Sequence, residues 1–132
     1  MFEYINPDSK YIAEYIELGG KELAYDVLKM IPEDYQNRIT KLEEAIRKFD
    51  YPAIQMEVHT IKANFRQIVD VDNEFMIFVQ QFEDASRTLA EKKEKNIPVQ
   101  ENVDFTGYFN RFKKESDIVV KEIGAFADTF AP

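Results

Sequence analysis

The feature that most constrains the fold is a set of five apolar residues near the middle of the chain. They follow one another at spacings of four, three, four and three residues: Ile54, Val58, Ile61, Phe65 and Ile68. This spacing places all five on one stripe of an α-helix, and such a stripe packs against other helices across a core. We therefore predict a core-facing helix that is capped by Asp50, has Pro52 in its first turn and reaches about Val69.

Four further segments show apolar residues at helical spacing. We expect helices over about residues 7–18, 21–48, 72–93 and 104–130, the last two opening at Asp72 and Asp104. Gly19 and Gly20 end the first of these segments. Pro32 lies inside the second and removes a backbone hydrogen bond, so we expect a kink or a break there. The apolar stripe of this second segment begins with Leu23, Val27, Met30 and Ile31.

Few residues interrupt these segments, since the 132-residue chain has only four glycines and five prolines. No useful stretch alternates apolar and polar residues with a period of two, so strands are not expected. The length is typical of one domain, which we expect to span residues 1–132. We predict an all-α fold: an antiparallel up-down four-helix bundle with a short extra N-terminal helix.

Composition excludes several classes of function. The chain has no cysteine, which excludes disulfides, thiolate metal sites and cysteine nucleophiles. Its net charge of −8 would repel a phosphate backbone, so we expect no nucleic-acid partner. The first residues have no basic start or apolar run, and no segment is apolar enough to span a bilayer. We therefore expect a cytoplasmic protein without a membrane partner.

Metal and nucleotide cofactors are not expected either. Helical bundles hold di-metal sites through Glu-x-x-His pairs, but the residue three before the only histidine, His59, is Met56. A zinc site with one histidine and no cysteine is improbable, and no glycine-rich phosphate loop occurs. Most of the acidic residues are interpreted as the polar faces of helices, and no pair of them stands out. His59 is the remaining candidate for chemistry.

His59 is expected at the rim of the predicted helix, because it is rotated by about 100° from the core residue Val58. Lys62 and Arg66 lie one and two turns further along the same face. A neutral imidazole is a nucleophile near pH 7, and nearby cations favour the neutral ring. Lys62 would balance the charge of a phosphoryl group on His59, and Arg66 would contribute less directly. A lone helical histidine is nevertheless more often a surface residue without a role.

The sequence around His59 supports a functional interpretation. Residues 58–63 read Val-His-Thr-Ile-Lys-Ala and resemble the Ala-His-x-Leu-Lys-Gly signature of the histidine-containing phosphotransfer (HPt) domain. Upstream, residues 42–54 resemble the family's pattern of a helix end, an Asp-aromatic turn and the start of the histidine helix. Downstream, Phe82 and Glu83 match its usual apolar-Glu pair. The resemblance covers roughly residues 19–89.

This resemblance implies a phosphorelay carrier of two-component signal transduction and not a stand-alone enzyme. His59 would accept a phosphoryl group from a receiver-domain aspartyl phosphate, and Lys62 would be its electrostatic partner. The partners would be response-regulator receiver domains, with a hybrid histidine kinase as a further candidate, and Mg²⁺ would be bound by the receiver only. The family docks its partners around the histidine and on the short N-terminal helix, which points to residues Gln55, Met56, Ala63, Ile12 and Ile16.

Two departures from the family pattern leave an alternative open. Ala63 replaces the glycine that leaves room for the incoming receiver, and the second family glycine falls at about Asp70. One added methyl group is expected to slow transfer without preventing it. The alternative is a non-catalytic, HPt-like module that binds receivers or other signalling proteins.

Overall fold

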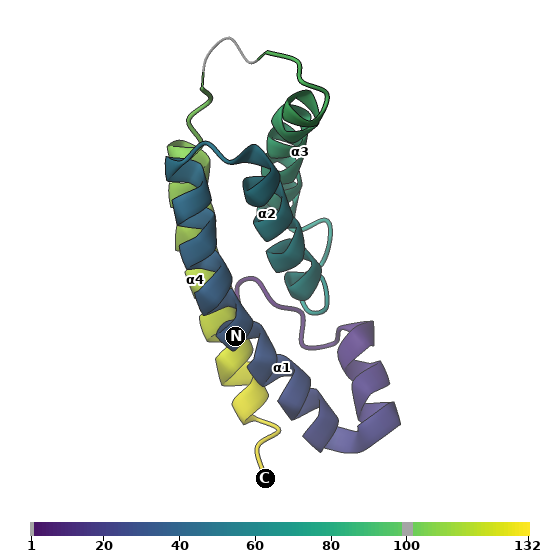
Figure 1. The fold of residues 1–132 in the computed structure, drawn as a ribbon. Coiled ribbons are helices and arrows are strands. Elements are labelled where there is room, and N and C mark those ends of the chain that lie inside the picture. The colour runs from purple at the N-terminus through teal and green to yellow at the C-terminus, as the bar shows by residue number, and fades with distance from the viewer. Residues whose placement is uncertain (1, 99–101) are drawn as a thin grey trace.

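The computed structural model describes residues 2–98 and 102–132 (Figure 1). These ranges contain four helices and no strand, which confirms the all-α prediction: α1 (Lys10–Arg47), α2 (Tyr51–Phe65), α3 (Glu74–Glu94) and α4 (Thr106–Asp128). Helix α1 packs against α2 and α4, and α2 packs against α3. Among the described residues, no helix combines the length and the apolar character that crossing a membrane requires.

The predicted apolar stripe of α2 faces the core. All five of its residues are at most 1% exposed, including Phe65 at the last position of the helix and Ile68 just beyond it. Aromatic side chains from the other three helices and from the residue before α4 also belong to the core. The largest of these fully buried rings belong to Tyr35, Phe75, Phe82, Phe105 and Phe112.

Helix α1 changes direction at Gly20. This residue has φ 73° and ψ −172°, a non-helical conformation in the region of φ that favours glycine. The interruption predicted from Gly19 and Gly20 is therefore present, and Figure 1 shows the bend. Of the kink or break expected at Pro32, the break is wrong, because α1 continues through this residue. Burial of the neighbouring Ile31 and Tyr35 holds this part of α1 in place despite the missing N–H group.

The ends of α2 and α3 follow local capping rules. The Asp50 carboxylate accepts a hydrogen bond from a backbone N–H in the first turn of α2, and Pro52 occupies that turn, as predicted. Helix α2 ends at Phe65, four residues earlier than expected from the apolar spacing, which continues into the following turn. Asn73, and not Asp72, caps α3, because its side chain accepts from the Phe75 N–H at 2.9 Å.

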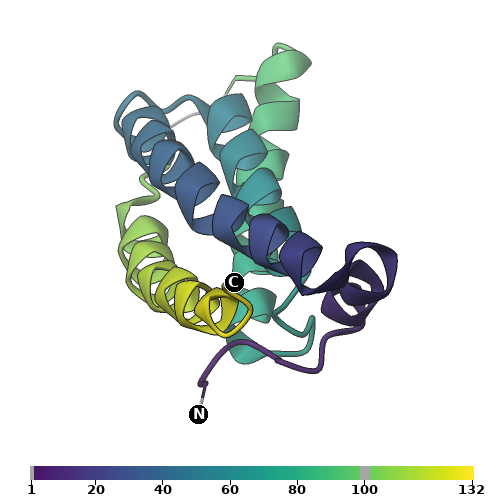
Figure 2. The same cartoon turned by 90° about the horizontal axis from the view of Figure 1, so that it is seen from below.

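The N-terminal segment ties α4 to the link between α2 and α3. The Glu122 carboxylate on α4 accepts hydrogen bonds from the backbone N–H groups of Glu3, Tyr4 and Ile5 at 3.0, 2.9 and 3.2 Å. The Asn6 N–H then donates to the carbonyl of Ile68 at 2.7 Å. Figure 2 shows this segment running across the end of the helices. These contacts place the start of α1 beside the C-terminal end of α2.

Candidate functional site

His59 lies on α2, and its imidazole contacts α3. Its side chain is 55% exposed, whereas the preceding Val58 is fully buried. The imidazole Nδ1 atom lies 2.8 Å from Oε1 of Glu83, a residue of α3. The packing of α3 on α2 therefore fixes one side of the ring and leaves much of the remainder in solvent.

Glu83 is the buried centre of this site. The residue is 0% exposed, and its Oε1 atom accepts from Lys62 Nζ at 2.9 Å as well as contacting His59. Its other oxygen, Oε2, pairs with the guanidinium of Arg87, one turn further along α3. Glu83 is an exception to the interpretation of most acidic residues as polar helix faces, because the packing of α3 on α2 covers it. Glu57, which is 3% exposed, is another exception.

The carboxyl group of Glu83 stays ionised. Burial alone would raise its pKa, but the hydrogen bonds from Lys62 and His59, together with their charges, outweigh burial and lower the pKa below 4.5. An ionised carboxylate accepts hydrogen bonds and cannot donate them. Nδ1 of His59 must therefore carry the hydrogen in the His59–Glu83 bond. In the neutral ring this leaves a lone pair on Nε2, which is the nitrogen available for nucleophilic attack.

Lys62 is less exposed than the sequence suggests. Its side chain is only 9% exposed, and its ammonium also donates to Gln80 Oε1 at 3.0 Å. The positive charge of Lys62, predicted to lie at the rim, is therefore paired with the carboxylate of Glu83. Gln80 in turn donates to Asp84, which also pairs with Arg87 at 2.9 Å. Residues from one face of α3 thus form a connected polar network around the histidine.

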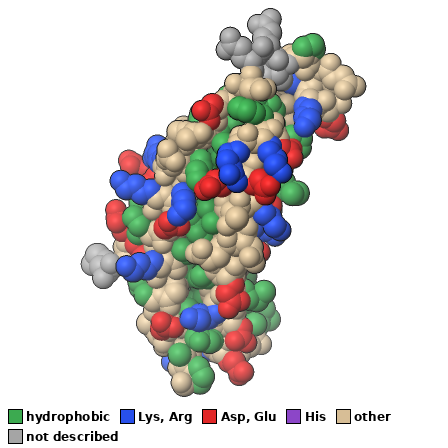
Figure 3. Space-filling view, turned by 60° about the vertical axis from the view of Figure 1, so that its left-hand side comes forward, with side chains coloured by type: hydrophobic (Ala, Val, Ile, Leu, Met, Phe, Trp, Pro, Cys, Tyr) green, Lys and Arg blue, Asp and Glu red, His purple; other side chains and the backbone are tan. Residues whose placement is uncertain are grey.

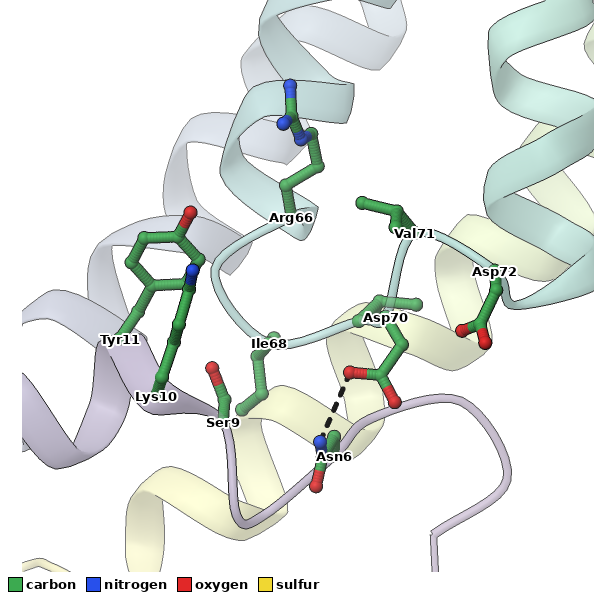
Figure 4. Close-up of a pocket in the computed structure, with 10 residues that line it drawn as sticks. Asn6, Ser9, Lys10, Tyr11, Arg66, Ile68, Asp70, Val71 and Asp72 are labelled. Carbon is green, nitrogen blue, oxygen red and sulfur yellow. Dashed lines mark hydrogen bonds between the residues drawn. The ribbon is translucent and has the colours of Figure 1, made fainter.

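The other predicted site residues are distributed around this network. Arg66 follows the last residue of α2 and is exposed, and Figure 4 shows its side chain extending along α2, away from Asp70 and Asp72. Met56 and Ile16 are exposed by 56% and 37%, Ala63 is exposed and Gln55 is half-buried. Ile12 belongs to the core and is 2% exposed, so it offers almost no surface to a partner.

Sequence reasoning missed Gln80 and Arg87 and gave Glu83 no role at the site. Spacings of three and four residues show that these side chains share one face of α3. No pattern within α3 shows that this face meets His59, because that contact depends on how two helices pack. The resemblance pointed to Glu83 only as a family match.

The lowered pKa of Glu83 predicts how its contribution to stability depends on pH. The stabilisation is fully present above pH 4.5, the ordinary pKa of the group, and is lost as the pH falls through the lower folded-state value. The difference in free energy of unfolding between wild type and Glu83→Gln should therefore shrink as the pH falls from 6 to 3. Urea unfolding at a series of pH values measures this difference, and a constant or growing difference would contradict the assigned charge.

The chain was also compared with known proteins. No family model matches it, and neither the curated proteins nor the solved structures give a match. The function is therefore argued from the geometry around His59.

Proposed function

We propose that this chain is an HPt-type phosphorelay carrier, which accepts a phosphoryl group on Nε2 of His59 from a receiver domain and passes it to another receiver. The observation that supports this most directly is the hydrogen bond between Nδ1 of the exposed His59 and the buried, ionised Glu83. The proposal includes the family's up-down bundle, with residues 10–19 as its extra N-terminal helix, and a cytoplasmic location.

In the proposed step, the lone pair of His59 Nε2 attacks the phosphorus atom of the receiver's aspartyl phosphate. The N–P bond forms as the bond from phosphorus to the aspartyl oxygen breaks, and the aspartate leaves as a carboxylate. Nδ1 keeps its hydrogen, so the ring becomes positively charged beside the Glu83 carboxylate, which stabilises that charge. Transfer to a second receiver reverses these changes. The receiver supplies the Mg²⁺.

The cations near His59 would balance the negative charge of the phosphoryl group. Arg87 is bound to the same carboxylate as His59, and its side chain is 41% exposed, so it can turn towards solvent more freely than Lys62. Lys62 acts from within the network by keeping Glu83 ionised and in place. The backbone of Arg66 lies about 10 Å along the helix axis from that of His59. Arg66 therefore depends on the length of its side chain to reach the phosphoryl group.

The test is phosphoryl transfer from a panel of phosphorylated receiver domains from the same source, followed by intact-protein mass spectrometry. The wild-type chain should gain one acid-labile phosphoryl group, and His59→Gln should gain none. Labelling that survives His59→Gln, or no transfer from any receiver of a complete panel, would contradict the proposal.

A docking module without chemistry is the second candidate, and the exposed Ala63 one turn after His59 favours it. Its methyl group lies on the face that an incoming receiver would approach. Receiver binding that is unchanged in His59→Ala, together with an absence of transfer, would support this candidate. Restoring the family glycine with Ala63→Gly should speed transfer if the carrier is active.

A further inference from the structure

A hollow lies on the surface between the C-terminal end of α2 and the start of α3, next to the His59 network. Its lining consists of two cations, two amides and three apolar side chains: Lys62, Arg66, Gln80, Gln81, Val71, Met76 and Ile77. None of the described residues that line it carries a carboxylate, although the chain as a whole has a net charge of −8. The face drawn in Figure 3, by contrast, intersperses Lys and Arg with Asp and Glu.

Arg66 supplies most of the positive charge of this hollow. The charge of Lys62 is opposed by Glu83 at 2.9 Å. Arg66 forms none of the ion pairs found within residues 2–98 and 102–132. Two aspartates, Asp70 and Asp72, line a second pocket on its other side, but the Arg66 side chain extends away from them (Figure 4). Its guanidinium is therefore available to a group outside the chain.

Apolar side chains lie beside this cation. Val71 and Ile77, which line the hollow, are 65% and 47% exposed. An interface commonly combines an apolar contact area with a few directed polar contacts. A guanidinium offers a planar pair of N–H groups that match a carboxylate. This surface is thus complementary to an acidic side chain that has an apolar neighbour.

We propose that Arg66 and this hollow recognise an acidic side chain, flanked by an apolar one, on the receiver that docks over His59. The inference rests on the proposed function, because it takes a receiver as the partner. A carboxylate placed against Arg66 would favour partners that carry it and raise the rate of encounter. Partners with a lysine or arginine at the same place would be rejected by like charge.

A purely structural role for Arg66 predicts a different result. A cation at the C-terminal end of a helix interacts favourably with the helix dipole, which stabilises the fold without any partner. Arg47 is a matched control, since it is an exposed cation in the last turn of α1 and lies near the opposite end of α2. Substitutions at the two positions should have similar effects on stability and different effects on binding.

The experiment measures the affinity of each unphosphorylated receiver of the panel for wild type, Arg66→Gln, Arg66→Glu and Arg47→Glu by calorimetry. For the receiver that binds wild type most tightly, Arg66→Glu should lower the affinity by about tenfold or more, as the loss of one interfacial charge pair implies. Arg66→Gln should lower the affinity by a smaller factor. Arg47→Glu should bind like wild type. The loss in Arg66→Glu should diminish at high salt. Changing the contacting acid of the receiver to lysine should restore binding to Arg66→Glu.

Equal affinity of Arg66→Glu and Arg47→Glu would overturn this inference, as would the absence of binding by every receiver. Transfer to His59 at saturating receiver is scored separately, so the two proposals can fail independently. Transfer without any dependence of binding on Arg66 retains the carrier and rejects the recognition site. Binding that depends on Arg66 without transfer retains the recognition site and favours the docking module.

Discussion

Replacing Glu83 with alanine is expected to lower the free energy of unfolding by about 3–5 kcal/mol, as the removal of one partner from a buried ion pair does. The Lys62 side chain is only 9% exposed, and in this variant its ammonium loses the Glu83 carboxylate as a partner. Gln80 would be its one remaining partner among the described contacts. Urea unfolding at pH 7, followed by circular dichroism, measures the change.

Two further variants make the result specific to the buried charge. Glu91→Ala removes an exposed carboxylate two turns further along α3 and should change stability by less than about 0.5 kcal/mol. Glu83→Gln keeps the shape and an acceptor for Lys62, so it should be less destabilising than Glu83→Ala. Equal effects of Glu83→Ala and Glu91→Ala would show that the buried pair does not contribute as described.

Phe82→Ala is expected to produce a loss of similar size, about 3–5 kcal/mol, because it opens a cavity in the core. Phe82 is fully buried on α3, and its ring centroid lies 5.7, 5.2 and 5.6 Å from those of Phe105, Tyr108 and Phe112. These aromatic contacts connect α3 to α4 and to Phe105, the residue that precedes α4. Thermal and urea unfolding measure the loss.

Leu18→Ala is the control for Phe82→Ala, because Leu18 is 80% exposed and its truncation leaves no buried cavity. It should leave the unfolding midpoint nearly unchanged. A Phe82→Ala variant that unfolds at the same urea concentration as Leu18→Ala would mean that the ring cluster does not hold α3 against α4.

The helices were predictable from sequence because each one buries a periodic apolar stripe. The stripe on α2 and the interruption near Gly20 follow from spacing and from glycine chemistry. Burial of individual residues on α1 was not fully predictable. Met30 falls on its predicted stripe but is 65% exposed, because the stripe is wider than the surface that its neighbours cover. The break considered at Pro32 is absent because tertiary packing outweighs one missing hydrogen bond.

The candidate site was predictable only in part. Periodicity along α2 placed His59 beside the core stripe, and its side chain is 55% exposed. The same reasoning placed Lys62 on the exposed rim, where α3 in fact covers it. Contacts between α2 and α3, above all that of His59 with Glu83, depend on the register in which the two helices pack. No periodicity within a single helix encodes that register.

The most direct test of the central claim is a ¹⁵N nuclear magnetic resonance spectrum of the histidine-labelled protein before and after phosphorylation by a receiver. His59 is the only histidine, so every imidazole signal belongs to it. The account predicts that Nδ1 carries the hydrogen when the ring is in its neutral form. After phosphorylation it predicts a phosphoryl group on Nε2 with the Nδ1 hydrogen retained. A neutral ring protonated on Nε2, or a phosphoryl group on Nδ1, would contradict the role assigned to Glu83 and the proposed transfer step.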